Sequence, residues 1–279
     1  MGMTGAISIA GLACLRSGAG LVTLGVPSSS LVVVAGFSPS YMTMSLPSDE
    51  FGRLGDGAEE LVLSKISERS CIAIGPGLGR SAVSDRLVRR LFSEPVATTI
   101  FDADALNALS ESDAWRVIRD QHDPQADPAS KPASEFHRIL TPHPGEWERL
   151  SGVSAANRRD QEVAADRIAM ATKSVIVLKG NGTWITDGTQ SVRNETGNPS
   201  LACGGNGDCL TGMIAAFVCQ GLAPFDAAAL AVHLHGVAGD IAHKELGTPS
   251  TLPTDIIAYL PMAFRSFKAN EPTIGFQVR

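Results

Sequence analysis

The stretch NPSLACGGNGDCLTGMIAAF (198–217) decides the fold class and points to the chemistry. Gly204, Gly205 and Gly207 crowd together just before a run whose apolar residues recur at helical spacing. Glycine lets the backbone approach a ligand, and the first turn of a helix presents free N–H groups with a partial positive charge. The stretch therefore predicts an anion site, suited to phosphate, where a glycine-rich turn opens a helix.

Asp208 stands at the mouth of that helix, and two roles fit it. A carboxylate at this position is a common N-cap, which needs no chemistry. A carboxylate beside a phosphate site is also able to take a proton from a hydroxyl while the backbone amides hold the phosphate. The two roles are compatible, so both remain open at this point.

Moving outward, short apolar strands alternate with helical segments along the chain. Helical spacing covers residues 4–18, 80–92 and 160–172, and the near-continuous apolar runs are 21–27, 71–75, 96–102, 138–142 and 174–180. This pattern predicts an α/β fold with a mostly parallel sheet covered on both faces. Two β-rich runs flank Asp187-Gly188, which predicts a hairpin near 183–192 with a two-residue turn. We find no domain boundary, and we interpret 121–136 as an exposed loop.

Further glycine-rich turns follow the predicted strands. KGNGTW (179–184) combines a lysine able to reach a phosphate with glycines that free the backbone, although a plain strand-to-hairpin turn has the same composition. GPGLGR (75–80) is a second strand–loop–helix junction but lacks dinucleotide-binding spacing. Because the carboxyl ends of parallel strands meet at one rim, these turns predict one ligand site.

Polar residues follow two other strands at the same rim. His143 is fixed between two prolines in LTPHPGEWERL (140–150), which favours ligand contact, while Glu146 is placed to cap the following helix. Asp102 and Asp104 in FDADALNAL (101–109) suit either magnesium held through water or an ordinary helix start.

Composition narrows the class of partner. The formal net charge is −6 with no Lys/Arg run, which argues against nucleic-acid and anionic-membrane partners. The five cysteines include no CxxC pair, as expected for thiols kept reduced in the cytoplasm. The apolar N-terminus lacks a basic leader and is interrupted by Arg16, so it does not resemble a signal peptide. Residues 17–48 are uncharged but rich in Pro, Gly and Ser, which we interpret as turns between sheet elements.

The ordered set of motifs resembles one known family. It consists of GAISIAGLACLRSGAGLVT (5–23), GPGLG (75–79), DADALN (102–107), LTPHPGE (140–146), KG-x-x-T (179–183) and NPSLACGGNGD (198–208). In this order, from about Gly5 to about Pro261, it is similar to the ADP-dependent NAD(P)H-hydrate dehydratases. The resemblance implies a three-layer αβα ribokinase-like fold in a single domain over 1–279.

The resemblance also implies an activity. ADP, or ATP in most eukaryotic relatives, would phosphorylate the ring hydroxyl of (6S)-NADHX or (6S)-NADPHX, and loss of phosphate would restore NADH or NADPH. Magnesium would accompany the nucleotide. A homo-oligomer, a tetramer by family resemblance, is expected as well, partly because of the small residues and histidines around 226–243.

The resemblance implies a role for each residue that matches a position in the family's motifs. Asp208 would be the catalytic base. The hydrated dinucleotide would contact residues from four motifs, namely Ala6, Gly79, His143 and Asp208. The nucleotide would contact the turn after the strand and the glycine cluster, namely Lys179, Gly180, Asn181, Gly182, Thr183 and Gly207. The anion hole itself would be Gly204, Gly205, Asn206 and Gly207.

Two departures from the family pattern stand out. Relatives begin with a strand ending in a Gly-Ser turn, preceded by a basic glycine-containing stretch, and neither is present before Gly5. Either the recorded start lies too far downstream or the chain is a shortened form. We expect unpaired sheet backbone and a weakened wall of the substrate site. The common Thr of the glycine cluster is Asn206 and a usual Val is Cys209, which we expect the anion hole to tolerate.

Two alternatives remain at this stage. A ribokinase-like kinase for a small vitamin precursor would also use an Asp after a glycine cluster. An inactive nucleotide-binding relative would result if the missing strand were indispensable.

Overall fold

The structure is a computed structural model that describes residues 3–67, 69–112, 115, 138–247 and 249–269. A six-stranded sheet runs in the order β3-β4-β5-β6-β7-β8. Its strands are β3 (Cys71–Ile74), β4 (Thr98–Phe101), β5 (Arg138–Leu140), β6 (Ser174–Leu178), β7 (Trp184–Thr186) and β8 (Ser191–Arg193). The first four are parallel and the last two antiparallel. The predicted mostly parallel sheet with a terminal hairpin is confirmed.

The hairpin turn differs in detail from the prediction. Thr186 pairs with Ser191, so four residues rather than two connect β7 to β8. The Asp187 carboxylate accepts the backbone N–H groups of Thr189 at 2.8 Å and Gln190 at 2.9 Å. This side chain closes the turn in a way that the Asp-Gly dipeptide alone did not reveal.

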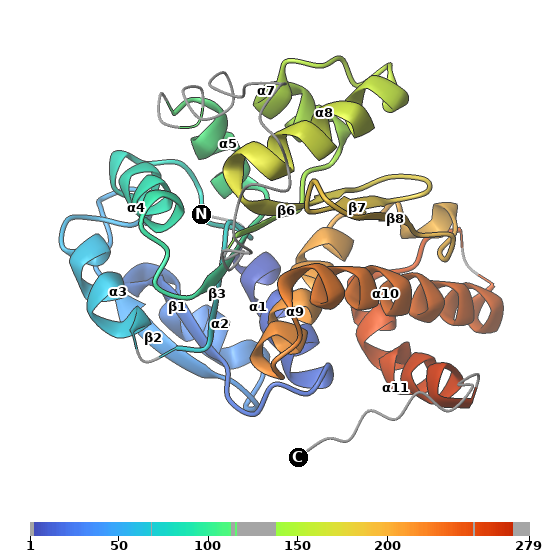
Figure 1. The fold of residues 1–279 in the computed structure, drawn as a ribbon. Coiled ribbons are helices and arrows are strands. Elements are labelled where there is room, and N and C mark those ends of the chain that lie inside the picture. Colours follow the sequence, from blue (N-terminus) through green and yellow to red (C-terminus); the bar gives the residue numbers. More distant parts are fainter. Residues whose placement is uncertain (1–2, 68, 113–114, 116–137, 248, 270–279) are drawn as a thin grey trace.

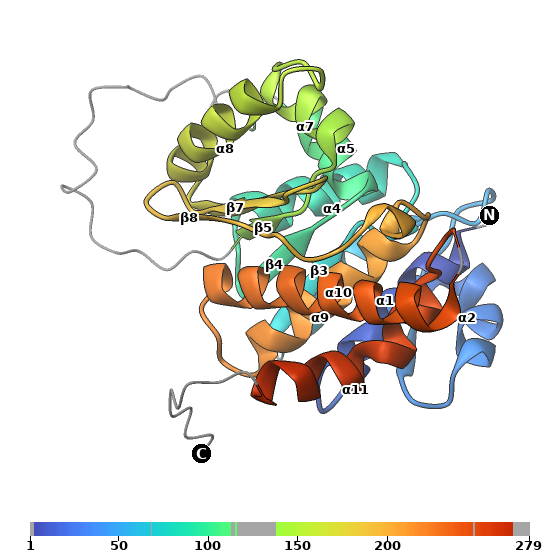
Figure 2. The same ribbon diagram turned by 90° about the vertical axis from the view of Figure 1, so that its right-hand side faces the viewer.

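Helices cover both faces of this sheet, as Figures 1 and 2 show. On one face lie α4 (Ala82–Ser93), α5 (Asp104–Ser110), α7 (Pro144–Ser151) and α8 (Arg158–Thr172). On the other lie α1 (Thr4–Arg16), α9 (Asn206–Cys219), α10 (Pro224–Leu246) and α11 (Pro253–Ala269). In β6, Val175 and Val177 join the core on the α9 side, whereas Ile176 and Leu178 join the opposite core. The three-layer αβα architecture is therefore confirmed.

A smaller sheet lies beside the large one. It pairs β1 (Thr23–Pro27) in parallel with β2 (Met42–Leu46), and the short η1 (Ser28–Ser30) and α2 (Leu31–Phe37) connect them. α3 (Ala58–Ile66) then leads back to β3, and η3 (Pro199–Leu201) precedes α9. We interpreted 17–48 as turns between sheet elements, and the structure also places α2 and β2 there, which the sequence analysis did not predict. β2 is only partly buried and mixes Met with Thr and Ser, so it lacks the apolar run of a buried strand.

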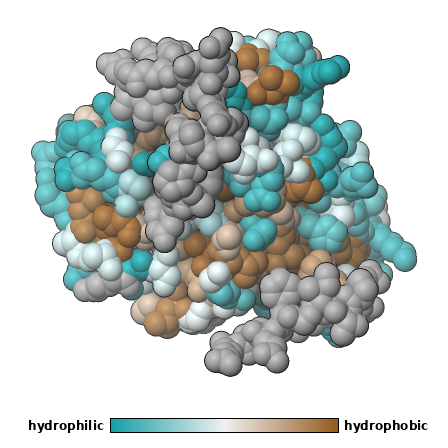
Figure 3. Space-filling model, viewed as in Figure 1, coloured by the Kyte–Doolittle hydropathy of each residue, from teal (hydrophilic) through white to brown (hydrophobic). Residues whose placement is uncertain are grey.

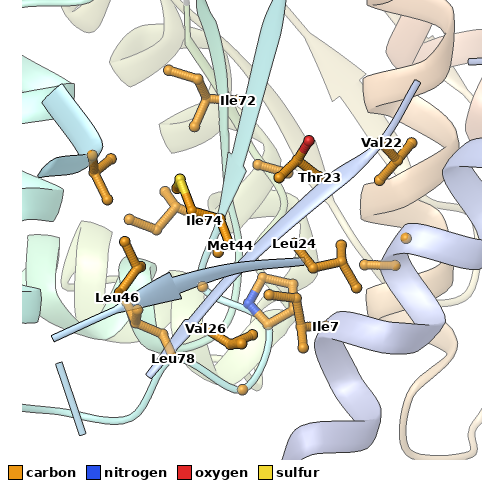
Figure 4. A pocket seen from close by; sticks show the side chains of 18 of the residues that line it. Ile7, Val22, Thr23, Leu24, Val26, Met44, Leu46, Ile72, Ile74 and Leu78 are labelled. Atoms are coloured by element: carbon orange, nitrogen blue, oxygen red, sulfur yellow. The ribbon is translucent and has the colours of Figure 1, made fainter. Parts of the chain in front are cut away.

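The expected unpaired sheet backbone is present. β1 and β3 are each paired on one side only and belong to separate sheets. A cavity of about 700 Å³ lies between them, bounded by both strands, β2 and α1. Among the side chains labelled in Figure 4, all but Thr23 are apolar. This part of the core is hollow, whereas both faces of the six-stranded sheet are packed.

The remaining expectations concern the surface. On the face seen in Figure 3, polar residues surround several separate hydrophobic patches. Within the described segments, no helix is long and apolar enough to span a membrane. The expected loop 121–136 lies outside the described residues.

Candidate active site

The N-terminus of α9 forms the centre of the site. Its N-cap is Gly205, whose φ of 93° is the left-handed conformation that favours glycine. The backbone N–H groups of Gly207 and Asp208 have no acceptor within the described part of the chain, so both point free at the mouth of the helix. Asp208 is therefore not the N-cap, which was one of its two sequence interpretations. It stands in the first helical turn, beside the free amides.

An ion pair lies directly against this turn. The Nζ of Lys179 is 2.9 Å from Oδ1 of Asp102, and Thr211 of α9 donates its hydroxyl to Oδ2 of Asp102 at 2.8 Å. A Cβ added to Gly207 would stand 3.3 Å from the Lys179 Nζ. The absence of a side chain at Gly207 thus keeps the lysine ammonium in contact with the anion site. The sequence predicted a phosphate-reaching lysine but not its carboxylate partner.

Asp102 has a structural partner set that the sequence did not predict. Only 2% of its side chain is exposed, against 20% for Lys179. Burial, the largest effect, would raise the pKa of Asp102, but the charge of the Lys179 ammonium together with hydrogen bonds from Lys179 and the threonine hydroxyls outweighs it, and the pKa is lowered. Because its oxygens bind Lys179 and Thr211, Asp102 acts as an anchor between β4, β6 and α9.

The same charges set the ionisation of Asp208. Burial raises its pKa, the Asp102 carboxylate raises it further, and the Lys179 ammonium partly opposes both. The pKa of Asp208 rises to about 6 as a result. A carboxyl group with this pKa is ionised at neutral pH and is a stronger base than an ordinary aspartate.

His143 is the N-cap of α7, at the rim position that follows β5. Its Nδ1 accepts the N–H groups of Gly145 at 3.1 Å and Glu146 at 3.3 Å, while Glu146 accepts the His143 N–H at 2.8 Å. The expected capping role of Glu146 is confirmed as one half of a reciprocal capping box. Burial and the Lys179 ammonium lower the pKa of His143, which favours the neutral ring at pH 7. The side chain is half-exposed, and its Nε2 lies 3.4 Å from Oε1 of Glu146.

Arg158 organises the turn after β6, and sequence reasoning missed it. Its guanidinium donates to the carbonyl groups of Leu178 at 2.9 Å, Lys179 at 3.0 Å and Gly182 at 3.2 Å. These three bonds fix the backbone of the 179–183 turn beside the anion site. Arg158 is the first residue of α8 and lies in no glycine motif, so no local signal marked it.

The loop after β3 is tied to the same rim. Asp104 of α5 accepts the backbone N–H of Gly79 at 2.9 Å. A Cβ added to Gly77 would stand 3.2 Å from the Cβ of Ala6, so the start of α1 packs on this loop. Asp104 thus fixes the loop after β3 and does not cap α5, because the N-cap of α5 is Ala103.

The two residues that depart from the family pattern have buried side chains. Asn206 is buried, and its Nδ2 donates to the carbonyl groups of Leu201 and Thr251 at 3.0 Å each. This side chain ties the start of α9 to η3 and to the segment before α11. Cys209 is fully buried in the core between α9 and the sheet. The assignment of Asn206 to the anion hole therefore concerns its backbone, because its side chain amide binds Leu201 and Thr251.

The remaining candidate metal ligands do not form a cluster among the described residues. No group of three or more His, Cys, Asp or Glu able to hold a metal ion occurs among the described residues. His235 is fully buried and its pKa falls to about 4 through burial, while His233 packs on Phe267. The large cavity of Figure 4 reaches Gly79 but neither Asp208 nor Lys179 lines it. The residues around Asp208 and this cavity are therefore separate features.

Comparison with known proteins gives a consistent result. The family described as NAD(P)H-hydrate dehydratase matches residues 1–262. A bifunctional NAD(P)H-hydrate repair enzyme from Moorella thermoacetica is 40% identical over 276 residues, which is 98% of this chain but 49% of that protein. The chain thus spans about half the length of the bifunctional relatives it matches.

Two further relatives are closer in length. An ADP-dependent (S)-NAD(P)H-hydrate dehydratase from Streptococcus pneumoniae is 30% identical, covering 92% of this chain and 81% of its own. The Bacillus subtilis ADP/ATP-dependent NAD(P)H-hydrate dehydratase, co-crystallised with ATP and Mg²⁺ and soaked with CoA, has a TM-score of 0.72 at 28% identity. That match covers 95% of this chain and 88% of the B. subtilis one.

Proposed function

The chain belongs to the NAD(P)H-hydrate dehydratase family, and from this premise we propose that it uses ADP to dehydrate (6S)-NADHX and (6S)-NADPHX. The products would be NADH or NADPH, AMP and phosphate. This is a lyase reaction that repairs damaged nicotinamide nucleotides. The observation that carries the proposal is the Asp208 carboxylate beside two free backbone amides and the Lys179 ammonium.

The chemistry follows from this arrangement. Asp208, with a pKa raised to about 6, would take the proton of the ring hydroxyl as its oxygen attacks the terminal phosphorus of ADP. The amides of Gly207 and Asp208 and the Lys179 ammonium would stabilise the charge on the transferred phosphoryl group. Loss of phosphate from the ring would then restore the dihydronicotinamide.

The proposal also assigns substrate contacts to other residues along the rim. The nucleotide would lie on the turn fixed by Arg158, touching Lys179, Gly180, Asn181, Gly182 and Thr183, with its phosphate end at Gly207. The hydrated dinucleotide would contact Ala6, Gly79 and His143 as well as Asp208. The neutral half-exposed His143 ring suits a hydrogen bond to an uncharged part of that substrate.

Magnesium would enter with the nucleotide. The described residues form no metal-binding cluster of their own, and Mg²⁺ commonly keeps its waters and binds nucleotide phosphates. When bound, the ion would neutralise phosphate charge.

The quaternary and cellular context is also proposed. A homo-oligomer, by family resemblance a tetramer, would be checked by light scattering. In this structure the small residues of α10 pack within the chain, since Gly236 meets Thr196 and Gly239 meets Leu201. All five cysteines are free thiols, as expected in a reducing cytoplasm.

The test is a direct assay. Purified protein, (6S)-NADHX, Mg²⁺ and ADP are mixed, and NADH absorbance is followed, with ATP in a parallel cell. Recovery of NADH together with AMP and phosphate supports the dehydratase. A vitamin-precursor kinase would instead leave NADHX unchanged and phosphorylate an added alcohol, and an inactive nucleotide-binding relative would turn over neither compound.

A further inference from the structure

A carboxylate on α8 joins two arginines beside the turn at 179–183. Glu162 accepts a hydrogen bond from Nε of Arg158 at 2.9 Å on one oxygen, and from Arg193 at 2.6 Å on the other. Only 13% of the Glu162 side chain is exposed. Arg158 lies on the same helix and Arg193 on β8, so the carboxylate links α8 to the terminal hairpin. We call these three residues the arginine clamp.

Both arginines of the clamp bind carbonyl groups of the turn. Arg158 donates to three of them, and Arg193 donates to the carbonyl of Gly182 at 3.2 Å. A Cβ added to Gly180 would stand 3.3 Å from the Arg158 guanidinium. One added to Gly182 would stand 3.2 Å from the guanidinium of Arg193. Each guanidinium therefore packs against a glycine, at a distance that a larger residue would disturb.

The turn presents hydrogen-bond donors on its remaining side. The backbone N–H groups of Gly180, Asn181 and Gly182 have no acceptor in the described segments. Gly180 and Gly182 have φ angles of 139° and 65°, in the region that favours glycine. Successive free N–H groups of this kind form a surface that binds anions and other acceptor groups. The clamp thus occupies carbonyl groups of the turn and leaves these amides available for a ligand.

We propose that Glu162 is a positioning residue that sets the affinity of this turn for the nucleotide, an inference that rests on the proposed nucleotide contact at 179–183. Two guanidiniums that share the Gly182 carbonyl repel each other, and the carboxylate bound to both offsets the repulsion. Glycine loses more backbone freedom on ordering than other residues, so a turn with two glycines binds weakly unless it is already ordered. The clamp orders it before the ligand arrives, and such preorganisation raises affinity.

The phosphoryl-transfer groups have a separate support. The Nζ of Lys179 is held by Asp102 at 2.9 Å, and Asp208 lies on α9. Neither of these placements uses Glu162. Loss of the clamp should therefore weaken nucleotide binding and leave the rate at saturating nucleotide nearly unchanged.

The test measures binding and turnover separately. Isothermal titration calorimetry gives the Kd of the intact protein for ADP with Mg²⁺, and initial rates with (6S)-NADHX give kcat and the KM for ADP. Glu162→Ala should raise the Kd and the KM for ADP about tenfold, with kcat within about twofold of wild type. Glu94→Ala is the matched control and should change none of these values. Glu94 binds Arg90 at 2.8 Å with the same i,i+4 spacing at the end of α4.

A second variant covers the case in which Glu162→Ala folds poorly. Arg193→Met removes one guanidinium from a half-exposed position on β8 and should raise the Kd for ADP about threefold. The inference is overturned if the folded variants bind ADP as wild type does, or if kcat falls as much as KM rises. ADP binding that depends on Glu162 without recovery of NADH would refute the proposed reaction and support the clamp. Failure of the wild-type protein to bind ADP would refute both.

Discussion

The rim around Asp208 is held by many hydrogen bonds, whereas the space between β1 and β3 is poorly packed. At the rim, Asp102 is satisfied by Lys179 and Thr211 at 2.9 and 2.8 Å, and Arg158 fixes the adjoining turn through three hydrogen bonds. Between the two sheets, the unpaired edges of β1 and β3 border a mostly apolar cavity of about 700 Å³. The difference teaches that the groups proposed for phosphoryl transfer are held by hydrogen bonds that do not involve the packing beside β1.

The largest expected effect is on catalysis at the rim. Asp208→Asn removes the proposed base but keeps the shape of the side chain, so turnover of NADHX with ADP should fall about 10²–10⁴-fold. Steady-state kinetics measures this. Asp226→Asn, an exposed first-turn aspartate of α10, is the matched control and should keep the wild-type rate. Near-normal turnover by Asp208→Asn would remove Asp208 from the mechanism.

The next effect concerns the ion pair that supports the rim. Lys179→Met leaves the buried Asp102 carboxylate without its cation, which should lower the free energy of unfolding by about 3–5 kcal/mol. Urea denaturation measures the change. Lys244→Met, at an exposed lysine of α10, should change it by less than about 0.5 kcal/mol. Equal losses in the two variants would show that the Lys179–Asp102 pair is not anchored as described.

A pair of isoleucines compares the two regions through packing. Ile100 of β4 is fully buried in the sheet core, whereas Ile72 of β3 is partly exposed and lines the cavity. Ile100→Ala should cost about 3–5 kcal/mol and Ile72→Ala about 1 kcal/mol, because the second side chain already borders empty space. Thermal or urea unfolding of both variants gives the ratio. Similar costs would mean that the cavity is filled in solution.

The smallest effect is a stability change with pH. The folded-state pKa of Asp208, about 6, lies above its ordinary 3.8, so its contribution to stability is present below about pH 4 and is lost as pH rises through about 6. Asp208→Asn should therefore be more stable than wild type by about 1–2 kcal/mol near pH 8 and equal near pH 4. Unfolding at both pH values tests this, and a constant difference would contradict the raised pKa.

Whether a feature could be predicted from the sequence depends on whether a short contiguous stretch of residues encodes it. The strands and the glycine turns after them are contiguous, so apolar runs and Gly204–Gly207 located them. The partnership of Lys179 with Asp102 spans 77 residues, and the contacts of Arg158 span 20 to 24, so no local pattern contains them. β2 was missed because a strand that is only partly buried does not need an apolar run. The roles of the site residues stay proposals until they are measured.

The most direct test of the account is the pH dependence of kcat/KM for NADHX with ADP. The wild-type value should be level near pH 8 and fall about tenfold per unit below about pH 6, as Asp208 takes up its proton. The residual activity of Asp208→Asn should lack this fall, which separates the aspartate from ionisation of the nucleotide. A wild-type profile that stays flat to about pH 5, or the same fall in both proteins, would contradict the assignment of Asp208 as the base.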